Sequence, residues 1–169
     1  MLVNRASPHQ SICGAAPRRK ALGFTLIELV FTIAIMAVLA TLAAPSFREF
    51  IATQRIRNAS FDLMAALTLA RSEAITHNAN VDMVRTSTAW DGGWTVSTAT
   101  STLLNQQAYK GMNITDSAGL AKIIYGKDGR AVTASTQFTI APTTALTGVS
   151  SRCISLGLSG LPSSKLGGC

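Results

Sequence analysis

An apolar run over residues 24–47 constrains this chain more than any other feature, because it holds a single charged residue, Glu28. About 20 apolar residues suffice to cross a bilayer as a helix. The run is apolar all round and lacks the polar face of a core helix in a globular domain. A charge inside a bilayer is costly, so Glu28 needs a cationic partner. We therefore predict a membrane-spanning helix.

The composition agrees with one such helix beside one compact domain. Hydrophobic residues make up 47% of the 169 residues and charged residues only 14%, which excludes a wholly disordered, collagen-like or acidic chain. The length allows one domain plus one extra element. The net charge is +7, but four basic residues and no acidic ones precede the run. The rest of the chain is only mildly basic.

Basic residues flank the run on both sides. Those that precede it are Arg5, Arg18, Arg19 and Lys20. Those that follow it closely are Arg48, Arg55 and Arg57. The positive-inside rule therefore places the N-terminus in the cytoplasm, but by a small margin.

A cleaved secretory signal is an alternative reading of the same run, since basic residues precede it. Cleavage after Ala44 would put the bulky Leu42 third before the cut and Pro45 directly after it, whereas small residues are expected there. The run is also longer than the apolar core of such a signal. Membrane retention fits better.

Apolar periodicity continues beyond Pro45, which would kink a membrane helix rather than end it. Small or apolar residues recur at three- and four-residue spacing: Ile56, Ala59, Leu63, Ala66, Leu67, Ala70 and Ala74. Polar residues mark the opposite face: Arg55, Asn58, Asp62 and Glu73. A polar cluster at 76–80 is the predicted stop. We expect one helix from residue 24 to about 78, about 80 Å long.

The remaining two thirds carry strand signals. Short β-prone segments separated by Asp-Gly and Gly-Gly turns occur at 81–86, 94–98, 103–110, 122–125, 131–133, 137–141 and 152–158. Residues 142–151 are rich in Thr, Ser and Gly and are predicted to be a loop. The spacing of the segments predicts a small antiparallel sheet or sandwich laid on the amphipathic half of the helix.

The sequence GFTLIE at residues 23–28, with basic residues before it and the apolar run after it, resembles the type III signal of type IV pilins and type II secretion pseudopilins. Pro45 stands where such helices carry a proline. The resemblance implies that a prepilin peptidase cuts between Gly23 and Phe24 on the cytoplasmic side and methylates the new amino group of Phe24. The 23-residue leader is long for the family, so the true start codon could lie further in.

The resemblance also gives Glu28 a role. It lies one helical turn from the new cationic amine of Phe24. In a filament of parallel helices, Glu28 of one subunit would pair with the Phe24 amine of its neighbour. That pairing would offset the burial of both charges and fix the axial register. Glu28 and Pro45 are thus the expected filament-assembly residues.

Three further segments resemble the GspH/FimT group of pseudopilins and minor pilins. They are LARSEAI at 69–75, WDGGWTV at 90–96 with the W-x-x-G-W pattern, and GKDGR at 126–130. We expect structural roles for all three. Trp90 and Trp94 would pack in the core or against a turn. The two glycines would supply a hairpin turn with positive φ.

Arg71 and Glu73 are expected to form a solvated or head-docking pair. The implied fold is α+β, with a long N-terminal helix packed on a small antiparallel β-sheet or sandwich head. The expected segments are a leader (1–23), a transmembrane or filament-core helix (24–47), an amphipathic half-helix (48–80) and a periplasmic β-rich head (81–169).

The cysteines fit this topology. Cys13 lies in the leader and would be removed, which leaves Cys153 and Cys169 as an even pair in a periplasmic segment, where disulfides form. A bridge would close a C-terminal loop and stabilise the head by about 3 kcal/mol in the chain-entropy model. Metal binding is disfavoured because His77 is the only histidine of the mature chain, and no cofactor is expected.

An enzyme is disfavoured because catalysis usually needs a base of near-neutral pKa, and the mature chain offers only His77. Residues 157–161 miss the G-x-S-x-G elbow because Leu161 replaces its last glycine. No phosphate-binding or dinucleotide glycine pattern occurs.

DNA binding is a stronger rival, since some members of this group take up DNA through a basic C-terminal tail. The motif of that tail is glycine-arginine-x-arginine. In this chain Leu161 and Ser163 stand where its two arginines would be, and few phosphate contacts remain. Candidate contacts are Lys122, Lys127, Arg130, Arg152 and Lys165. Some of these charges would also discourage aggregation at a sheet edge.

The sequence thus predicts a structural minor pilin that helps to prime or cap a type IV pilus. A GspH-type pseudopilin of a type II secretion system is the alternative, and a DNA-binding minor pilin is the second. The implied partners are other pilins or pseudopilins, the prepilin peptidase, the inner-membrane assembly platform and the membrane. The implied location is the inner membrane, with a single span and a periplasmic head, and then the pilus or pseudopilus.

Overall fold

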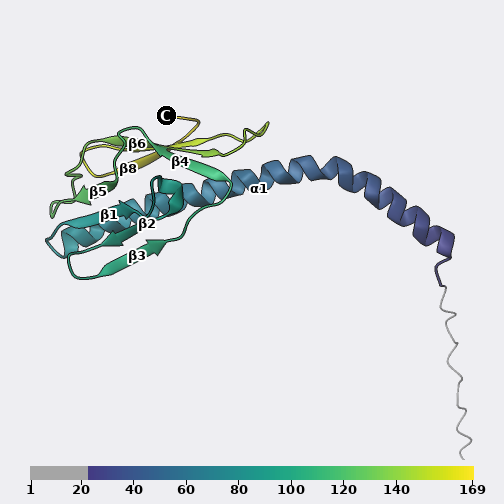
Figure 1. The fold of residues 1–169 in the computed structure, drawn as a ribbon, viewed down its shortest axis with the longest axis horizontal. Coiled ribbons are helices and arrows are strands. Elements are labelled where there is room, and N and C mark those ends of the chain that lie inside the picture. The colour runs from purple at the N-terminus through teal and green to yellow at the C-terminus, as the bar shows by residue number, and fades with distance from the viewer. Residues whose placement is uncertain (1–22) are drawn as a thin grey trace, which may run out of the picture. The chain divides into compact units, whose positions relative to one another are not determined.

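A computed structural model of the chain describes residues 23–169 (Figure 1). Cys13 and the basic residues before the apolar run lie outside this range. The described chain begins with one long helix, α1 (Leu26–Thr76), and continues with eight strands and a short 3-10 helix, η1 (Trp90–Gly92). It divides into two units after Ala40, so that α1 begins in the first unit and ends in the second.

Within the second unit, α1 buries one face. All seven residues predicted for that face are at most 2% exposed. The helix ends where the polar cluster begins. Asn78 has a left-handed backbone, with φ of 48°, and the amide of Ala79 donates a hydrogen bond to the carbonyl of Ala74 at 3.2 Å. This geometry caps the last turn of a helix, and asparagine tolerates it better than most residues.

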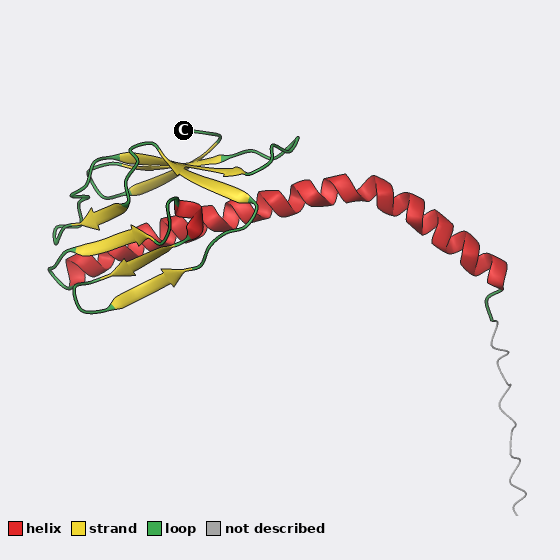
Figure 2. Ribbon diagram, in the orientation of Figure 1, coloured by secondary structure: helices red, strands yellow, loops and turns green. Residues whose placement is uncertain are grey.

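The first sheet is antiparallel with the order β3-β2-β1-β5. Its strands are β1 (Val81–Arg85), β2 (Trp94–Ser97), β3 (Thr102–Gln106) and β5 (Lys122–Tyr125). The second sheet is antiparallel with the order β4-β6-β7-β8. Its strands are β4 (Met112–Asp116), β6 (Thr136–Pro142), β7 (Arg152–Leu156) and β8 (Pro162–Leu166). The head is therefore built from two four-stranded sheets (Figure 2).

One core joins the buried face of α1 to the inner faces of both sheets. Alternate residues point inward along the strands, as in Val81 and Met83 of β1 and Phe138 and Ile140 of β6. The largest side chains in this core are aromatic: Trp90, Trp94, Tyr125 and Phe138. Burial of each large apolar side chain contributes about 1.5–3 kcal/mol, so this core fixes the head on the second half of α1.

The structure corrects two strand predictions and contains two strands that were not predicted. Residues 131–133 are not a strand, since only Ala131 forms an isolated bridge, to Tyr125. The predicted strand at 103–110 ends at Gln106, because the chain turns to let the amide of Tyr109 bond the carbonyl of Asp91 at 2.8 Å. Strands β4 and β8 were not predicted.

Candidate functional site

The Gly23–Phe24 bond lies just before the first turn of α1. No heavy atom lies within 4 Å of the place where a Cβ on Gly23 would stand, and Phe24 is 81% exposed. The hydroxyl of Thr25 accepts a hydrogen bond from the amide of Glu28 at 3.2 Å, which caps the helix start. The predicted cleavage bond thus lies in accessible, non-helical chain immediately ahead of a defined helix start.

Glu28 occupies the third helical position after Thr25, the spacing of a capping box. A carboxylate here also interacts favourably with the positive end of the helix dipole. The side chain is exposed on the surface of α1. Glu28 therefore contributes to the helix start through its backbone amide and its charge, a role that was not predicted although the Thr-x-x-Glu spacing is a sequence signal for it.

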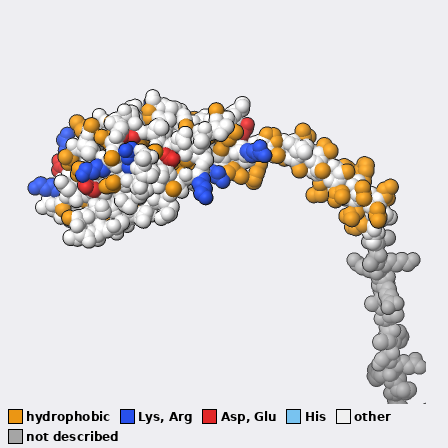
Figure 3. All heavy atoms as spheres, in the orientation of Figure 1, with side chains coloured by type: hydrophobic (Ala, Val, Ile, Leu, Met, Phe, Trp, Pro, Cys, Tyr) orange, Lys and Arg blue, Asp and Glu red, His pale blue; other side chains and the backbone are white. Residues whose placement is uncertain are grey.

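The N-terminal part of α1 presents an apolar surface that no other part of the described structure covers. An 18-residue window has a mean hydropathy of 2.5 and none of it is buried within the structure. Hydrophobic side chains cover this stretch in Figure 3. By length and composition, the helix can cross a membrane. It also runs through Pro45, which removes one backbone hydrogen bond without ending the helix.

The end of α1 is fastened to a turn of the head. The Nε atom of Arg71 donates a hydrogen bond to the carbonyl of Gly129 at 2.9 Å. Gly129 has φ of 73°, and a Cβ there would lie 2.6 Å from Cδ1 of Ile75. The predicted partner Glu73 pairs instead with His77, at 3.1 Å. The expected Arg71–Glu73 pair is thus replaced by a helix-to-turn bond and a separate pair along the helix.

The two tryptophans are core residues, as expected. Trp90 stacks edge-on against Phe138 with ring centroids 5.2 Å apart, and its indole N–H donates to the carbonyl of Leu120 at 3.1 Å. Of the two glycines expected to have positive φ, Gly93 does, at 93°. Gly92 does not, and it is needed for space, because a Cβ there would overlap the hydroxyl of Ser87.

A tyrosine not singled out from the sequence ties the loop after β3 to α1. The hydroxyl of Tyr109 donates a hydrogen bond to the carboxylate of Asp62 at 2.7 Å. Burial raises the pKa of Tyr109, and the hydrogen bond and charge of Asp62 raise it further. The sequence predicts Asp62 only as a polar-face residue of the helix. An aspartate at the margin of the apolar stripe, with a tyrosine far along the chain, gives no sequence signal of this bond.

The disulfide joins Cys153 in β7 to the C-terminal Cys169. Thr139 lies directly opposite Cys153 on β6, and its hydroxyl accepts a hydrogen bond from the amide of Cys169 at 3.4 Å. The bridge therefore holds the end of the chain against the β6–β7 pair. Among the described residues, no three His, Cys, Asp or Glu side chains gather as a metal site would need.

Three of the candidate DNA contacts lie on or just after β5. Lys122 forms an ion pair with Asp82 of the neighbouring strand at 3.5 Å. Lys127 and Arg130 are exposed in the following turn, where the amide of Arg130 bonds the carboxylate of Asp128 at 3.1 Å. These charges flank one edge of the first sheet.

The other two lie on the second sheet. Arg152 begins β7, and Lys165 of β8 lies opposite Cys153, the residue after Arg152. Because side chains alternate along a strand, Arg152 and Lys165 emerge on opposite faces of the sheet. The turn between β7 and β8 contains Gly160, which approaches Gly129, and it lies at the opposite end of the hairpin from Arg152 and Lys165. The five basic residues therefore do not form one continuous patch.

Two family models match the chain. The family described as type II transport protein GspH matches residues 59–160. The prokaryotic N-terminal methylation motif matches residues 18–44. Two curated relatives, each a fimbrial protein of Pseudomonas aeruginosa, are 30% identical over 94 residues, which is 56% of this chain and 59% of each relative. The match thus spans about three fifths of these relatives' length.

Two crystal structures of the type IV minor pilin FimU from Pseudomonas aeruginosa strain PAO1 are similar to this structure. Both have a TM-score of 0.57 at 17% identity. One match covers 67% of this chain and 88% of the solved chain, and the other covers 64% and 91%. At this identity the likeness establishes the fold alone, and it confirms the α+β architecture of a long apolar helix packed on antiparallel sheets.

Proposed function

The chain belongs to the family of type II transport protein GspH, and from that premise we propose that it is a structural minor pilin that helps to prime or cap a type IV pilus. It is a type IV pilin-like protein with an N-terminal methylation motif. The family and the fold are those of structural pilins, not of enzymes. The proposal adds three things to the family: cleavage by a prepilin peptidase, incorporation into a type IV pilus, and a role in starting or capping that filament.

The observation that carries the proposal is the accessible Gly23–Phe24 bond within the methylation motif, directly ahead of an apolar helix. Cleavage there by a prepilin peptidase would remove residues 1–23 and leave Phe24 as the methylated first residue. The helix would then lose its basic leader and keep an uninterrupted apolar surface after Glu28. Such a helix can leave the bilayer when like helices replace the lipid around it.

Glu28 would serve this assembly by pairing with the Phe24 amine of the next subunit. The carboxylate and the amine lie four residues apart in one chain, so a modest axial step brings one subunit's carboxylate level with its neighbour's amine. In an apolar helix bundle an unpaired charge is costly, and pairing selects one register among many. The capping role of Glu28 and this pairing are compatible, since the cap uses the backbone amide.

A pseudopilin of a type II secretion system is the second candidate, and the family match favours it. The fimbrial relatives and the C-terminal disulfide favour the pilus. In either case the head would lie in the periplasm before assembly, and the partners would be other pilins, the prepilin peptidase and the inner-membrane assembly platform. The five candidate DNA contacts form no single basic patch, so they give little support to DNA binding.

The test is deletion of the gene in its native host, followed by measurement of sheared surface pili and of secreted proteins. Complementation uses the wild type, Glu28→Gln and Glu28→Val. We expect loss of pili that the wild type restores. Glu28→Gln keeps the shape of the side chain and removes only its charge, so it isolates the pairing with Phe24. Both variants should be cleaved and should fail to restore pili.

Normal piliation in the deletion strain would contradict the pilus role. Normal piliation with loss of secreted proteins would assign the chain to the secretion system instead. Full restoration by Glu28→Gln would contradict the pairing of Glu28 with the amine of Phe24.

A further inference from the structure

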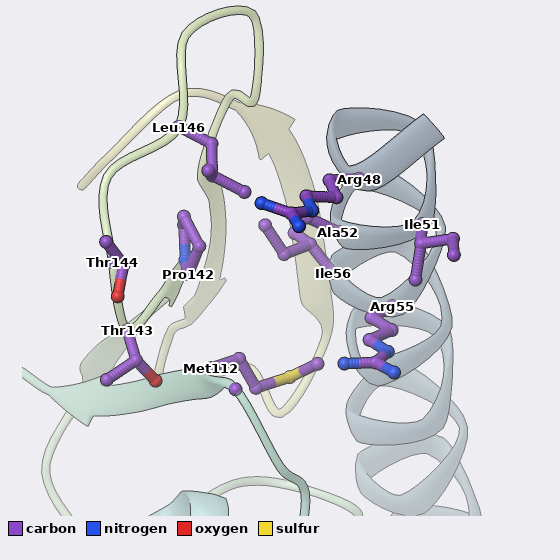
Figure 4. A pocket seen from close by; sticks show the side chains of 11 residues that line it. Arg48, Ile51, Ala52, Arg55, Ile56, Met112, Pro142, Thr143, Thr144 and Leu146 are labelled. Atoms are coloured by element: carbon purple, nitrogen blue, oxygen red, sulfur yellow. The ribbon is translucent and has the colours of Figure 1, made fainter. Parts of the chain in front are cut away.

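A pocket of about 340 Å³ lies between α1 and the loop that follows β6, wholly within the second unit. Apolar side chains form most of its walls, and Arg48 and Arg55 project from α1 at its margin (Figure 4). The guanidinium of Arg48 points toward Leu146, and that of Arg55 points toward Met112. Because the two arginines are seven residues apart, they share one face of the helix.

Both arginines lack an anionic partner within residues 23–169. Neither makes an ion pair there, and no acidic side chain lines the pocket. The carboxylate of the adjacent acid on α1, Glu49, does not line the pocket and lies instead 3.2 Å from the place of a Cβ on Gly148, in the loop after β6. Two cations beside an apolar, partly enclosed space match a ligand that carries both a negative group and a hydrocarbon part.

The position of the pocket relative to the apolar run follows from the order of residues along α1. Arg48 is the first residue after the apolar run, and Phe47 and Phe50 beside it are 63% and 58% exposed. Aromatic and arginine side chains gather at membrane–water interfaces, where their apolar parts meet lipid and their polar parts meet headgroups. The pocket therefore stands at the level where a spanning helix leaves the bilayer.

We propose that the pocket binds the phosphate headgroup of an anionic phospholipid through Arg48 and Arg55, and so docks the base of the head on the membrane before assembly. This inference rests on the proposed function, because it needs residues 24–47 to span the membrane. It also explains why cations directly follow the span on the translocated side, where the positive-inside rule disfavours them. The phosphate neutralises them, and the apolar walls meet the first carbons of the acyl chains.

The test uses the mature full-length chain in nanodiscs of phosphatidylcholine with a rising fraction of phosphatidylglycerol. The reporter is the ¹³C-methyl signal of Met112, which lines the pocket, and the buried Met83 of β1 is the internal reference. We expect the Met112 signal to shift and saturate as the anionic lipid increases, while Met83 stays unchanged.

The variants are Arg48→Gln and Arg55→Gln, alone and together, with Arg57→Gln as the matched control. Arg57 is an exposed arginine on the same helix that does not line the pocket. Each pocket substitution should weaken the apparent affinity for the anionic lipid about fivefold, and the control should not. The double variant should show almost no Met112 shift.

Three outcomes would overturn the inference. The first is a Met112 signal that does not shift as phosphatidylglycerol increases, although the chain has inserted into the nanodiscs. The second is an Arg57→Gln effect as large as those of the pocket variants, which would indicate unspecific charge attraction. The third is an equal shift with inorganic phosphate in neutral nanodiscs, which would indicate a free anion. Failure of the chain to insert at all would instead contradict the proposed function.

Discussion

Arg71 and Gly129 are joined by a hydrogen bond of 2.9 Å between the arginine Nε and the glycine carbonyl, so that the last turns of α1 hold the turn after β5. The same turn approaches the segment after β7, since a Cβ on Gly160 would overlap the carbonyl oxygen of Gly129. The hydroxyl of Tyr125 donates to the carbonyl of Gly160 at 3.2 Å. One turn thus connects the helix to both sheets.

Replacement of the arginine tests this connection. Arg71→Ala leaves the carbonyl of the buried Gly129 without its donor, and we expect a loss of about 1–3 kcal/mol in the free energy of unfolding. Urea unfolding of the full chain in neutral detergent measures it, with the fluorescence of the buried Trp90 and Trp94 as the signal. The exposed neighbour Ser72→Ala is the control. Equal free energies of unfolding for the two variants would contradict a stabilising role of the bond between Arg71 and Gly129.

A second prediction separates backbone strain from close packing. Gly160 has φ of 77° and Gly119 has φ of 66°, but only Gly160 lies against another backbone segment. Both alanine substitutions carry the strain of a left-handed residue. Gly160→Ala also overlaps Gly129 and should cost about 1–3 kcal/mol more than Gly119→Ala. Similar unfolding midpoints would show that the turns do not pack as described.

The parts of the fold that the sequence predicted are those with a strong apolar period. All seven residues predicted for the buried helix face are buried, because a long apolar stripe at three- and four-residue spacing fits one helix face. Ser60 is buried on this face too and was missed because it is polar. Strands such as β6 show a clear alternation of buried and exposed residues. Strand β8 was missed because Pro162 to Leu166 is a polar edge strand. It is held by its ladder to β7 rather than by burial, and its sequence carries no alternation.

In the candidate site too, local sequence patterns were predicted and contacts between distant residues were not. The methylation motif and the cysteine pair are local patterns, so the sequence located them. The bonds of Arg71 to Gly129 and of Tyr109 to Asp62 join residues 58 and 47 positions apart. Such contacts depend on how the sheets lie on the helix. The seven-residue spacing of Arg48 and Arg55 is visible in the sequence. The opposite wall of their pocket comes from the loop after β6, and the sequence predicts that loop but not its position against α1.

The disulfide should stabilise the head against unfolding. Reduction, or Cys153→Ser with Cys169→Ser, removes a constraint on the unfolded chain that is worth about 3 kcal/mol for a loop of this size. We expect a lower urea midpoint for the wild type in reductant and for the double variant without it. The double variant should not respond to reductant. A wild-type midpoint that reductant leaves unchanged would contradict a stabilising role.

Stability should fall at alkaline pH through two tyrosines, the buried Tyr125 and the half-buried Tyr109. Burial raises the pKa of Tyr109, with Asp62 adding to it, and burial raises the pKa of Tyr125 against the opposing charge of Arg71. Their contribution is complete below the unfolded pKa of about 10 and is lost as pH rises above it, because the unfolded chain releases these protons first. Tyr109→Phe should therefore show a smaller loss between pH 8 and 11. An unchanged loss would contradict the raised pKa of Tyr109.

The start of α1 matters most to the proposed assembly, because cleavage there creates both the free amine and the bare apolar helix. The decisive measurement is the intact mass, with N-terminal fragmentation, of the protein purified from membranes of cells that contain a prepilin peptidase. We predict a chain that begins at Phe24 and carries one added methyl group on its amine. A chain that retains residues 1–23 beside an active peptidase, or one cut within the apolar run after Ala44, would contradict this processing.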